Sequence, residues 1–258
     1  MPLDLASVVA PLRADPAATV LLFDFDGTLS PVVDDPAAAT ALPGVTELLE
    51  ELAGSYRLVG AVSGRPVAFL AGVLPSSVAL SGLYGLERRV GGEVVGHPEA
   101  PRWRPVVAEA VREIEAATAP GTELHGIGVE PKGLSITLHV RTRPELQDGA
   151  ELLARQVGGR LALDIRPAKM SVELHPPIPA DKGSALRDLA GDATGVLFAG
   201  DDVGDLPAFA ALDHLGLGER GVSVAIDGPE LPDDVRRRVQ LVLPDQLAIV
   251  RLLEALRP

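Results

Sequence analysis

Hydrophobic positions along most of the chain follow two alternating patterns. Short apolar runs predict buried strands, because the strands of a parallel sheet are covered by helices on both faces. Between the runs, apolar residues recur at the spacing of amphipathic helices, as at 43–52, after 181 and in the last stretch before the C-terminus. The runs occupy residues 20–23, 58–62, 78–80, 196–199, 222–226 and 241–243. This alternation predicts an α/β fold with a parallel-sheet core.

A different pattern fills the middle of the chain. Residues 134–140 alternate strictly between apolar and polar, as a half-exposed antiparallel strand does. Further strands are expected at 161–165 and 170–174, and helices at 104–117 and 145–157. We therefore predict that residues 88–175 form an α+β domain inserted into a core made of residues 1–87 and 176–258.

The strands of this insert predict a sheet with two unlike faces. The apolar face, covered by the helices, would carry Ile136, Leu138, Val172 and Leu174. The opposite face would carry Ser135, Thr137, His139, Ser171, Glu173 and His175. Such a polar face suits sugar hydroxyls, but an ordinary solvent-facing sheet has the same pattern. The pattern alone leaves both interpretations open.

Composition and charge narrow the function classes. The chain has 258 residues and a net charge of −13, which argues against non-specific binding to nucleic acid or to anionic membranes. It has no cysteine, so disulfides and thiolate metal sites are excluded and a metal would be a hard ion held by oxygen. Neither a basic leader nor an apolar run of membrane-spanning length is present. We expect a cytoplasmic protein.

Carboxylates follow two of the predicted strands. Asp24 and Asp26 come directly after residues 20–23 and, if the extended backbone continues, point to the same side. Another acidic group follows residues 196–199. Ligands of open α/β sheets bind at the carboxyl ends of strands, and Mg²⁺ prefers oxygen ligands. We therefore expect a Mg²⁺ site with the candidate ligands Asp24, Asp26, Asp201 and Asp205.

Four further residues are candidates for holding a phosphate. Ser63 and Arg65 follow residues 58–62, and Thr28 offers a hydroxyl beside the first two acids. Lys182 stands at the start of a predicted helix, where the helix dipole disfavours a cation unless an anion lies in front of it. The ordinary alternatives are a helix cap for Ser63, a loop brace for Arg65 and a surface position for Lys182.

The chemistry expected of these groups is phosphoryl transfer. Asp24 would attack phosphorus as the nucleophile, and Asp26 would act as the general acid and base. Ser63 and Lys182 would hold the phosphoryl oxygens, and Mg²⁺ would offset the repulsion between Asp24 and the phosphate.

Two charged segments and the histidines receive no catalytic role. Asp34 and Asp35 are expected in a solvated turn, and Arg236, Arg237 and Arg238 on a solvated helix face. The five histidines lack the spacing of metal ligands, so none is assigned to a metal.

The order of these motifs resembles the signatures of the haloacid dehalogenase (HAD) superfamily: D-x-D-G-T at 24–28, Ser63, Lys182, and G-D-D-x-x-x-D from Gly200. The insert resembles that of the trehalose-6-phosphate phosphatase family. The matching segments are 24–33, 63–65, 82–87, 130–135, 138–141, 167–169 with Glu173, and 181–183. The resemblance implies a HAD-like Rossmannoid core with an α+β cap that closes over it, in which Glu130, Lys132 and Glu173 hold sugar hydroxyls.

The resemblance also implies an activity: Mg²⁺-dependent hydrolysis of trehalose 6-phosphate, a small-molecule substrate, through an aspartyl-phosphate. We expect the protein to be a monomer. One departure concerns residues 200–207, which read GDDVGDLP where the family has G-D-D-x-T-D-E-D. This places the identity of the substrate in doubt. The alternatives are sucrose, glucosylglycerol or mannosylglycerate phosphate as substrate, transfer to another sugar, or a non-catalytic sugar-phosphate sensor.

Overall fold

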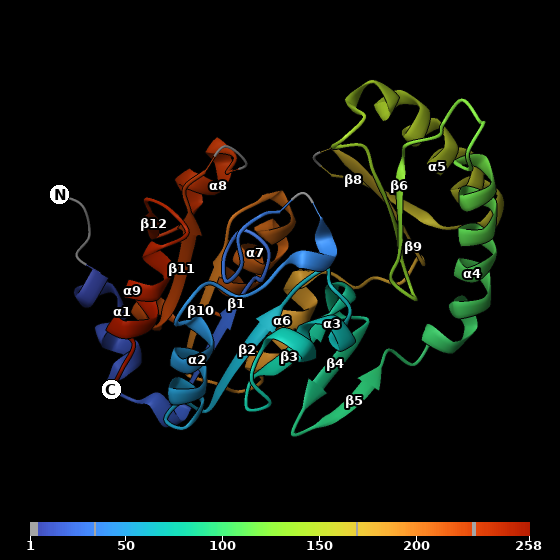
Figure 1. Cartoon of the computed structure of the whole chain (residues 1–258). Coiled ribbons are helices and arrows are strands. Elements are labelled where there is room, and N and C mark those ends of the chain that lie inside the picture. Colours follow the sequence, from blue (N-terminus) through green and yellow to red (C-terminus); the bar gives the residue numbers. More distant parts are fainter. Residues whose placement is uncertain (1–4, 34, 169, 229–230) are drawn as a thin grey trace. The chain divides into compact units, whose positions relative to one another are not determined.

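The computed structural model describes residues 5–33, 35–168, 170–228 and 231–258. The chain forms two compact units (Figure 1). The core unit comprises Met1–Val95 and Ala180–Pro258, and the insert unit comprises Gly96–Pro179. Within the described residues, no helix combines the length and apolar character needed to cross a membrane.

The core unit is built on an eight-stranded sheet with the order β12-β11-β10-β1-β2-β3-β4-β5. The strands from β12 to β3 are parallel, and β4 runs antiparallel to β3. Their bounds are β1 Thr19–Phe23, β2 Leu58–Val62, β3 Ala79–Gly82, β4 Glu87–Val90, β5 Glu93–Gly96, β10 Gly195–Gly200, β11 Gly221–Ile226 and β12 Leu241–Leu243. The parallel-sheet α/β core expected from the apolar runs is confirmed.

Helices cover both faces of this sheet, which explains why β1 is apolar at every position. Leu21 and Phe23 pack into the buried cluster formed with α2 and α9, whereas Val20 and Leu22 pack against α6 and α7 on the other face. The helices of the core unit are α1 Leu5–Arg13, α2 Val45–Ala53, α3 Val67–Val73, α6 Lys182–Ala190, α7 Leu206–His214, α8 Asp233–Arg238 and α9 Ala248–Ala255.

The boundaries of the insert differ from the expected ones. Residues 88–95 belong to the core unit, because β4 pairs with β3 and β5 follows β4 in the same sheet. This hairpin is largely exposed and carries charged residues, so its composition departs from that of the buried strands before it. At the other end, Pro176–Pro179 stays with the insert unit, and the core resumes at Ala180.

The insert unit is a four-stranded antiparallel sheet, β6-β7-β9-β8, with two helices. As expected, Ile136, Leu138, Val172 and Leu174 are buried. The elements are α4 Ala100–Ala117, β6 Gly128–Pro131, β7 Ile136–His139, α5 Gln147–Leu161, β8 Asp164–Ala168 and β9 Ser171–His175.

Two elements of the insert differ from the sequence prediction. The strand expected at 161–165 begins at Asp164, because α5 continues to Leu161 and ends at Ala162 in a left-handed conformation with φ 56°. The sequence pattern also missed β6, a short strand that ends in a proline.

Candidate active site

Asp24 lies at the carboxyl end of β1, in the middle of the core sheet. Its backbone N–H donates to Ala199 O at 2.8 Å and so continues the pairing of β1 with β10. Its carboxylate Oδ1 lies 2.8 Å from Lys182 Nζ, and the same ammonium lies 2.7 Å from Asp205 Oδ1. All three side chains are almost completely buried. The first residue of α6 thus places a buried cation between two carboxylates, as its unfavourable position at the helix start suggested.

Asp24, Asp201 and Asp205 form an acidic cluster in which one carboxylate oxygen of each lies within 4.8 Å of the others. Burial, reinforced by the charges of Asp24, Asp205 and Asp202, raises the pKa of Asp201 to about 10. The pKa of Asp24 is also raised well above its usual value by burial, although the charge of Lys182 acts in the opposite direction. Such concentrated negative charge fits a divalent cation, because carboxylate oxygens are the ligands that hard cations prefer.

Two glycines let these carboxylates approach the backbone. Gly27 has φ +82°, and a Cβ there would lie 2.0 Å from Asp201 Oδ2. A Cβ at Gly200 would lie 2.3 Å from the carboxylate of Asp205. The Gly27 carbonyl also accepts a hydrogen bond from Gln246 Nε2 at 3.0 Å. Gln246, just before α9, carried no signal in the sequence, because an isolated glutamine in a loop has no pattern.

Thr28 is completely buried, and its hydroxyl donates to Asp201 Oδ1 at 3.5 Å. The structure therefore brings Thr28 to the acidic cluster, where the sequence analysis expected a substrate contact.

Asp205 holds the loop after β10 together. Its Oδ2 accepts the backbone N–H groups of Asp201 at 2.8 Å and Asp202 at 3.2 Å, while its Oδ1 accepts from Lys182. Burial raises the pKa of Asp202 to about 6, with the charge of Asp205 adding to the effect. Both carboxylate oxygens of Asp205 accept hydrogen bonds from the protein, so Asp205 positions Lys182 and the loop after β10.

The stretch that departs from the family pattern begins α7. Gly204 N–H donates to Asp202 Oδ1 at 2.8 Å, and Pro207 stands in the first turn of the helix. A Cβ at Gly183 would lie only 2.4 Å from Pro207 O, so the starts of α6 and α7 touch through their backbones.

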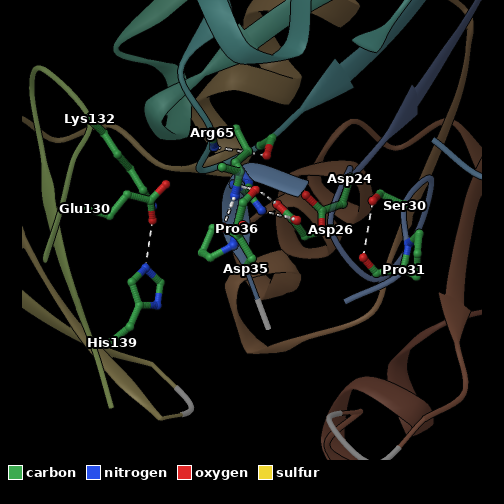
Figure 2. A network of polar contacts seen from close by, with 12 residues as sticks. Asp24, Asp26, Ser30, Pro31, Asp35, Pro36, Arg65, Glu130, Lys132 and His139 are labelled. Carbon is green, nitrogen blue, oxygen red and sulfur yellow. Dashed lines mark hydrogen bonds and ion pairs between the residues drawn. The ribbon is translucent and has the colours of Figure 1, made fainter. Parts of the chain in front are cut away.

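The carboxylate of Asp26 does not lie with that of Asp24 in the acidic cluster, as an extended backbone would have placed it. The chain turns at Phe25, whose carbonyl accepts the N–H groups of Thr28 and Ser30, so the extended geometry that would align Asp26 with Asp24 ends there. The Asp26 carboxylate instead receives two hydrogen bonds from Arg65, at 2.8 and 2.7 Å (Figure 2). Among the described residues, the acidic cluster does not include the Asp26 carboxylate.

Arg65 is the partner that explains this position. Its planar guanidinium matches the carboxylate with two parallel hydrogen bonds. It also donates to Pro36 O at 2.7 Å and lies 4.6 Å from the centre of the Phe69 ring. Arg65 therefore braces the loop, one of the two roles considered for it.

Ser63 is buried at the end of β2, and its Oγ accepts the backbone N–H of Arg65 at 3.1 Å. The adjacent loop holds it in place, because Ser63 O accepts from Tyr84 N–H at 3.1 Å and Arg65 O accepts from Leu83 N–H at 3.0 Å. Leu83 and Tyr84 have positive φ values of 49° and 57°. A Cβ at Gly64 would lie 2.8 Å from the Tyr84 ring. The turn thus holds Ser63 and Arg65 in place. Its segment, 82–87, is part of the family resemblance, but no role at the site was predicted for Leu83 or Tyr84.

The insert unit has its own polar cluster. Lys132 Nζ lies 3.3 Å from Glu173 Oε1 and 3.8 Å from Glu130 Oε2. Ser135 Oγ donates to Glu173 Oε1 at 3.0 Å. Burial acts to raise the pKa of Glu173, but the hydrogen bond with His175 and the charge of Lys132 outweigh it and hold that pKa well below its usual range. The structure thus brings the three expected sugar-binding residues together on one sheet.

The remaining predicted positions are peripheral. Asp34 and Lys169 lie outside the described residues. Asp35 caps a short turn by accepting Ala37 N–H, and Arg236 forms an exposed ion pair with Asp227, so both have the solvated roles expected of them. Across the described parts of the chain, the only group of acids and histidines close enough to hold a metal is the acidic cluster of the core unit.

Comparison with known proteins places the chain in a family. The trehalose-phosphatase family model matches residues 22–230. A trehalose-phosphate phosphatase of Mycobacterium leprae is 31% identical over 80% of this chain and 50% of its own length. A probable trehalose-phosphate phosphatase of Sinorhizobium fredii is 32% identical over 82% of this chain and 78% of its own. The chain spans about half the length of the mycobacterial relatives it matches.

Solved structures agree on the fold. The C-terminal domain of the Candida albicans trehalose-6-phosphate phosphatase has a TM-score of 0.77 at 22% identity, covering 99% of this chain and 97% of that one. A haloacid dehalogenase-like hydrolase from Bacteroides thetaiotaomicron has a TM-score of 0.61 at 15% identity, with 92% and 98% covered. The core therefore has the HAD fold, and the chain belongs to the trehalose-phosphatase family.

Proposed function

We propose that this protein is a phosphatase that hydrolyses trehalose 6-phosphate to trehalose and phosphate, acting as a monomer. The observation that carries the proposal is the buried contact of Asp24 with Lys182, next to Asp201 and Asp205, in a chain of this family. A carboxylate held beside a fixed cation, at the carboxyl end of a central strand, is suited to attack a phosphate ester.

The reaction has two steps. A carboxylate oxygen of Asp24 attacks phosphorus, and the bond from phosphorus to the sugar oxygen breaks, while Asp26 gives that oxygen a proton. Asp26 then takes a proton from water, which attacks phosphorus and releases phosphate, so that Asp24 is regenerated. In the structure Arg65 binds both oxygens of Asp26. The acid role therefore requires Asp26 to take up a proton from solvent and to exchange one of these hydrogen bonds for the leaving oxygen, and the proton that it later takes from water restores it.

Electrostatic compensation is the second requirement. Lys182 supplies a positive charge beside Asp24. Burial lowers the pKa of Lys182, but the charges of Asp205 and Asp24 outweigh this effect and raise that pKa well above its usual value. Mg²⁺, bound by Asp24 and Asp201 with Asp205 behind them, would supply the remaining positive charge and orient the phosphate. Ser63 and Thr28 add hydroxyls at the ends of the neighbouring segments.

The insert unit supplies the substrate preference in this proposal. Glu130 and Lys132 carry a carboxylate and an ammonium on the same sheet face, and sugar hydroxyls both donate and accept hydrogen bonds. The same arrangement fits the phosphates of sucrose, glucosylglycerol or mannosylglycerate, which remain the alternative substrates. A non-catalytic sensor is disfavoured, because a sensor has no need of the Asp24, Lys182 and Asp205 contacts.

Phosphate release from a panel of phosphate esters tests the proposal. The panel contains trehalose 6-phosphate, sucrose 6-phosphate, glucose 6-phosphate, glucosylglycerol phosphate and p-nitrophenyl phosphate, each with Mg²⁺ and with excess chelator. We expect the highest kcat/KM for trehalose 6-phosphate and reversible loss of turnover in chelator. Preference for another sugar phosphate would keep the phosphatase chemistry and replace the substrate. Absence of any phosphate release would overturn the proposal.

A further inference from the structure

The polar face of the insert sheet carries a hydrogen-bonded pair of which only one member, Glu130, has a role in the proposed function. His139 Nε2 lies 2.7 Å from Glu130 Oε2 (Figure 2). The side chains of His139 and Glu130 are 31% and 27% exposed, whereas those of Lys132 and Glu173 are 10% and 6% exposed. The pair is therefore the most accessible part of this polar cluster.

Strand register builds the pair. In the antiparallel pairing of β6 with β7, Gly128 stands opposite His139 and Glu130 stands opposite Thr137. Glu130 and His139 are thus diagonal neighbours on one face of the sheet, which is within reach of long side chains. Gly128 places no side chain beside the imidazole, so the ring can extend toward Glu130 without obstruction.

The chemistry of the pair suits hydroxyl groups. An ionised glutamate only accepts hydrogen bonds, so Nε2 of His139 donates to Glu130, while Nδ1 is an acceptor in a neutral ring and a donor in a charged one. The ammonium of Lys132, 3.8 Å from the same Glu130 oxygen, supplies a donor. Adjacent acceptors and a donor match neighbouring sugar hydroxyls, each of which donates one hydrogen bond and accepts others.

Glu173 has a different environment. It is nearly buried, accepts the Ser135 hydroxyl at 3.0 Å, and contacts Lys132 at 3.3 Å and His175 at 3.3 Å. A carboxylate engaged by three neighbouring side chains is suited to orienting Lys132. The accessible carboxylate of the cluster is that of Glu130.

We propose that His139 is a specificity-determining residue. It fixes the carboxylate of Glu130 and, together with it, binds a pair of sugar hydroxyls, while Glu173 supports Lys132 from below the surface. This inference rests on the proposed sugar-phosphate phosphatase function and adds a residue to its substrate contacts.

The test compares His139→Ala, His139→Asn, Glu130→Ala and the double variant of His139 and Glu130. We expect His139→Ala to raise KM for trehalose 6-phosphate by about tenfold, as loss of a hydrogen bond to a charged group does, with kcat within about twofold. His139→Asn, whose amide can donate to Glu130, restores most of the affinity. The double variant is no worse than Glu130→Ala alone, because the two residues act as one unit.

His125→Ala is the matched control, since His125 is an exposed histidine of the same unit. This variant keeps the KM of the wild type. p-Nitrophenyl phosphate, which has no sugar hydroxyls, serves as the second substrate, and we expect His139→Ala to lose far less kcat/KM with it than with the sugar phosphate.

Three results would overturn the inference: an unchanged KM in His139→Ala, equal losses on both substrates, or fully additive effects in the double variant. If His139→Ala fails to fold, His139→Phe takes its place under the same KM criterion, because phenylalanine keeps a ring of similar size but cannot donate to Glu130. Failure of the proposed function is recognised separately, because the wild-type protein would then release no phosphate from any sugar phosphate. If it prefers a different sugar phosphate, that substrate replaces trehalose 6-phosphate in the comparison.

Discussion

The core unit and the insert unit each carry a cluster of charged side chains, but the two clusters are held in different ways. In the core, the side chains of Asp24, Lys182 and Asp205 are at most 5% exposed, and Asp205 is fixed by backbone N–H groups. In the insert, Lys132 and His139 each contact Glu130 through side chains alone, and the three side chains are 10–31% exposed.

The difference separates two tasks. Backbone donors and glycines that admit a carboxylate hold the core cluster in one geometry, which reacting groups require. Side-chain pairs on a sheet can be exchanged one at a time without moving a strand. We therefore expect changes in the core cluster to abolish chemistry, and changes in the insert cluster to alter which substrate is used.

The largest effect is expected from Asp24→Asn. An amide is a poor nucleophile, so kcat should fall by roughly a thousandfold or more on every substrate. Phosphate release from trehalose 6-phosphate and p-nitrophenyl phosphate measures it. Substantial residual hydrolysis would remove Asp24 from the nucleophile role and would break the proposed separation.

The second-largest loss of activity is expected from Gly27→Ala. A methyl group there meets the Asp201 carboxylate at 2.0 Å and also forces alanine into a positive φ. We expect activity to fall by roughly a hundredfold, because small displacements of reacting groups are costly. Gly44→Ala is the matched control: Gly44 has φ +83° but no atom within 4 Å of its Cβ position. It should lose only about 1 kcal/mol of stability and keep activity. Equal behaviour of the two variants in activity and urea unfolding would contradict the argument.

Lys132→Ala tests the insert side of the comparison. Loss of its charge should lower kcat/KM for trehalose 6-phosphate by roughly 10- to 100-fold, while p-nitrophenyl phosphate is affected far less. Steady-state kinetics on both substrates gives the answer. Similar losses on the two would mean that Lys132 maintains the structure of the insert rather than reading the sugar.

The last prediction concerns the pH dependence of stability, not activity. The pKa of Asp201 rises from 3.8 to about 10 in the folded protein without a metal, so the folded state binds this proton more tightly than the unfolded chain. Stability without Mg²⁺ should therefore decrease as pH rises from about 4 toward 10. Saturating Mg²⁺ should displace the proton and weaken this dependence. Urea unfolding from pH 5 to pH 8, with Asp201→Asn as control, measures the slope, and an unchanged slope in that variant would oppose the assignment.

Much of the core cluster was predictable, because parallel strands bring their carboxyl ends to one edge regardless of the loops between them. For this reason Asp24, which follows residues 20–23, lies close to Asp201 and Asp205, which follow residues 196–199. The partner of Asp26 was not predictable, since a turn at Phe25 redirects it to Arg65, 39 residues away in sequence. Strands β4, β5 and β6 were not predictable either. The first two are largely exposed and lack an apolar face, and β6 is short and ends in proline, so none of the three has the hydrophobic periodicity on which strand prediction depends.

The backbone contact between Gly183 and Pro207 limits how this protein can diversify. Position 183 is closed to every side chain while the Pro207 carbonyl stays where it is, 2.4 Å from the point that a Cβ would occupy. Random mutagenesis of residues 204–207 should therefore recover variants that differ in side chains but share one path of the main chain. A library that randomises position 183 together with this stretch should return glycine at 183 in nearly every active clone.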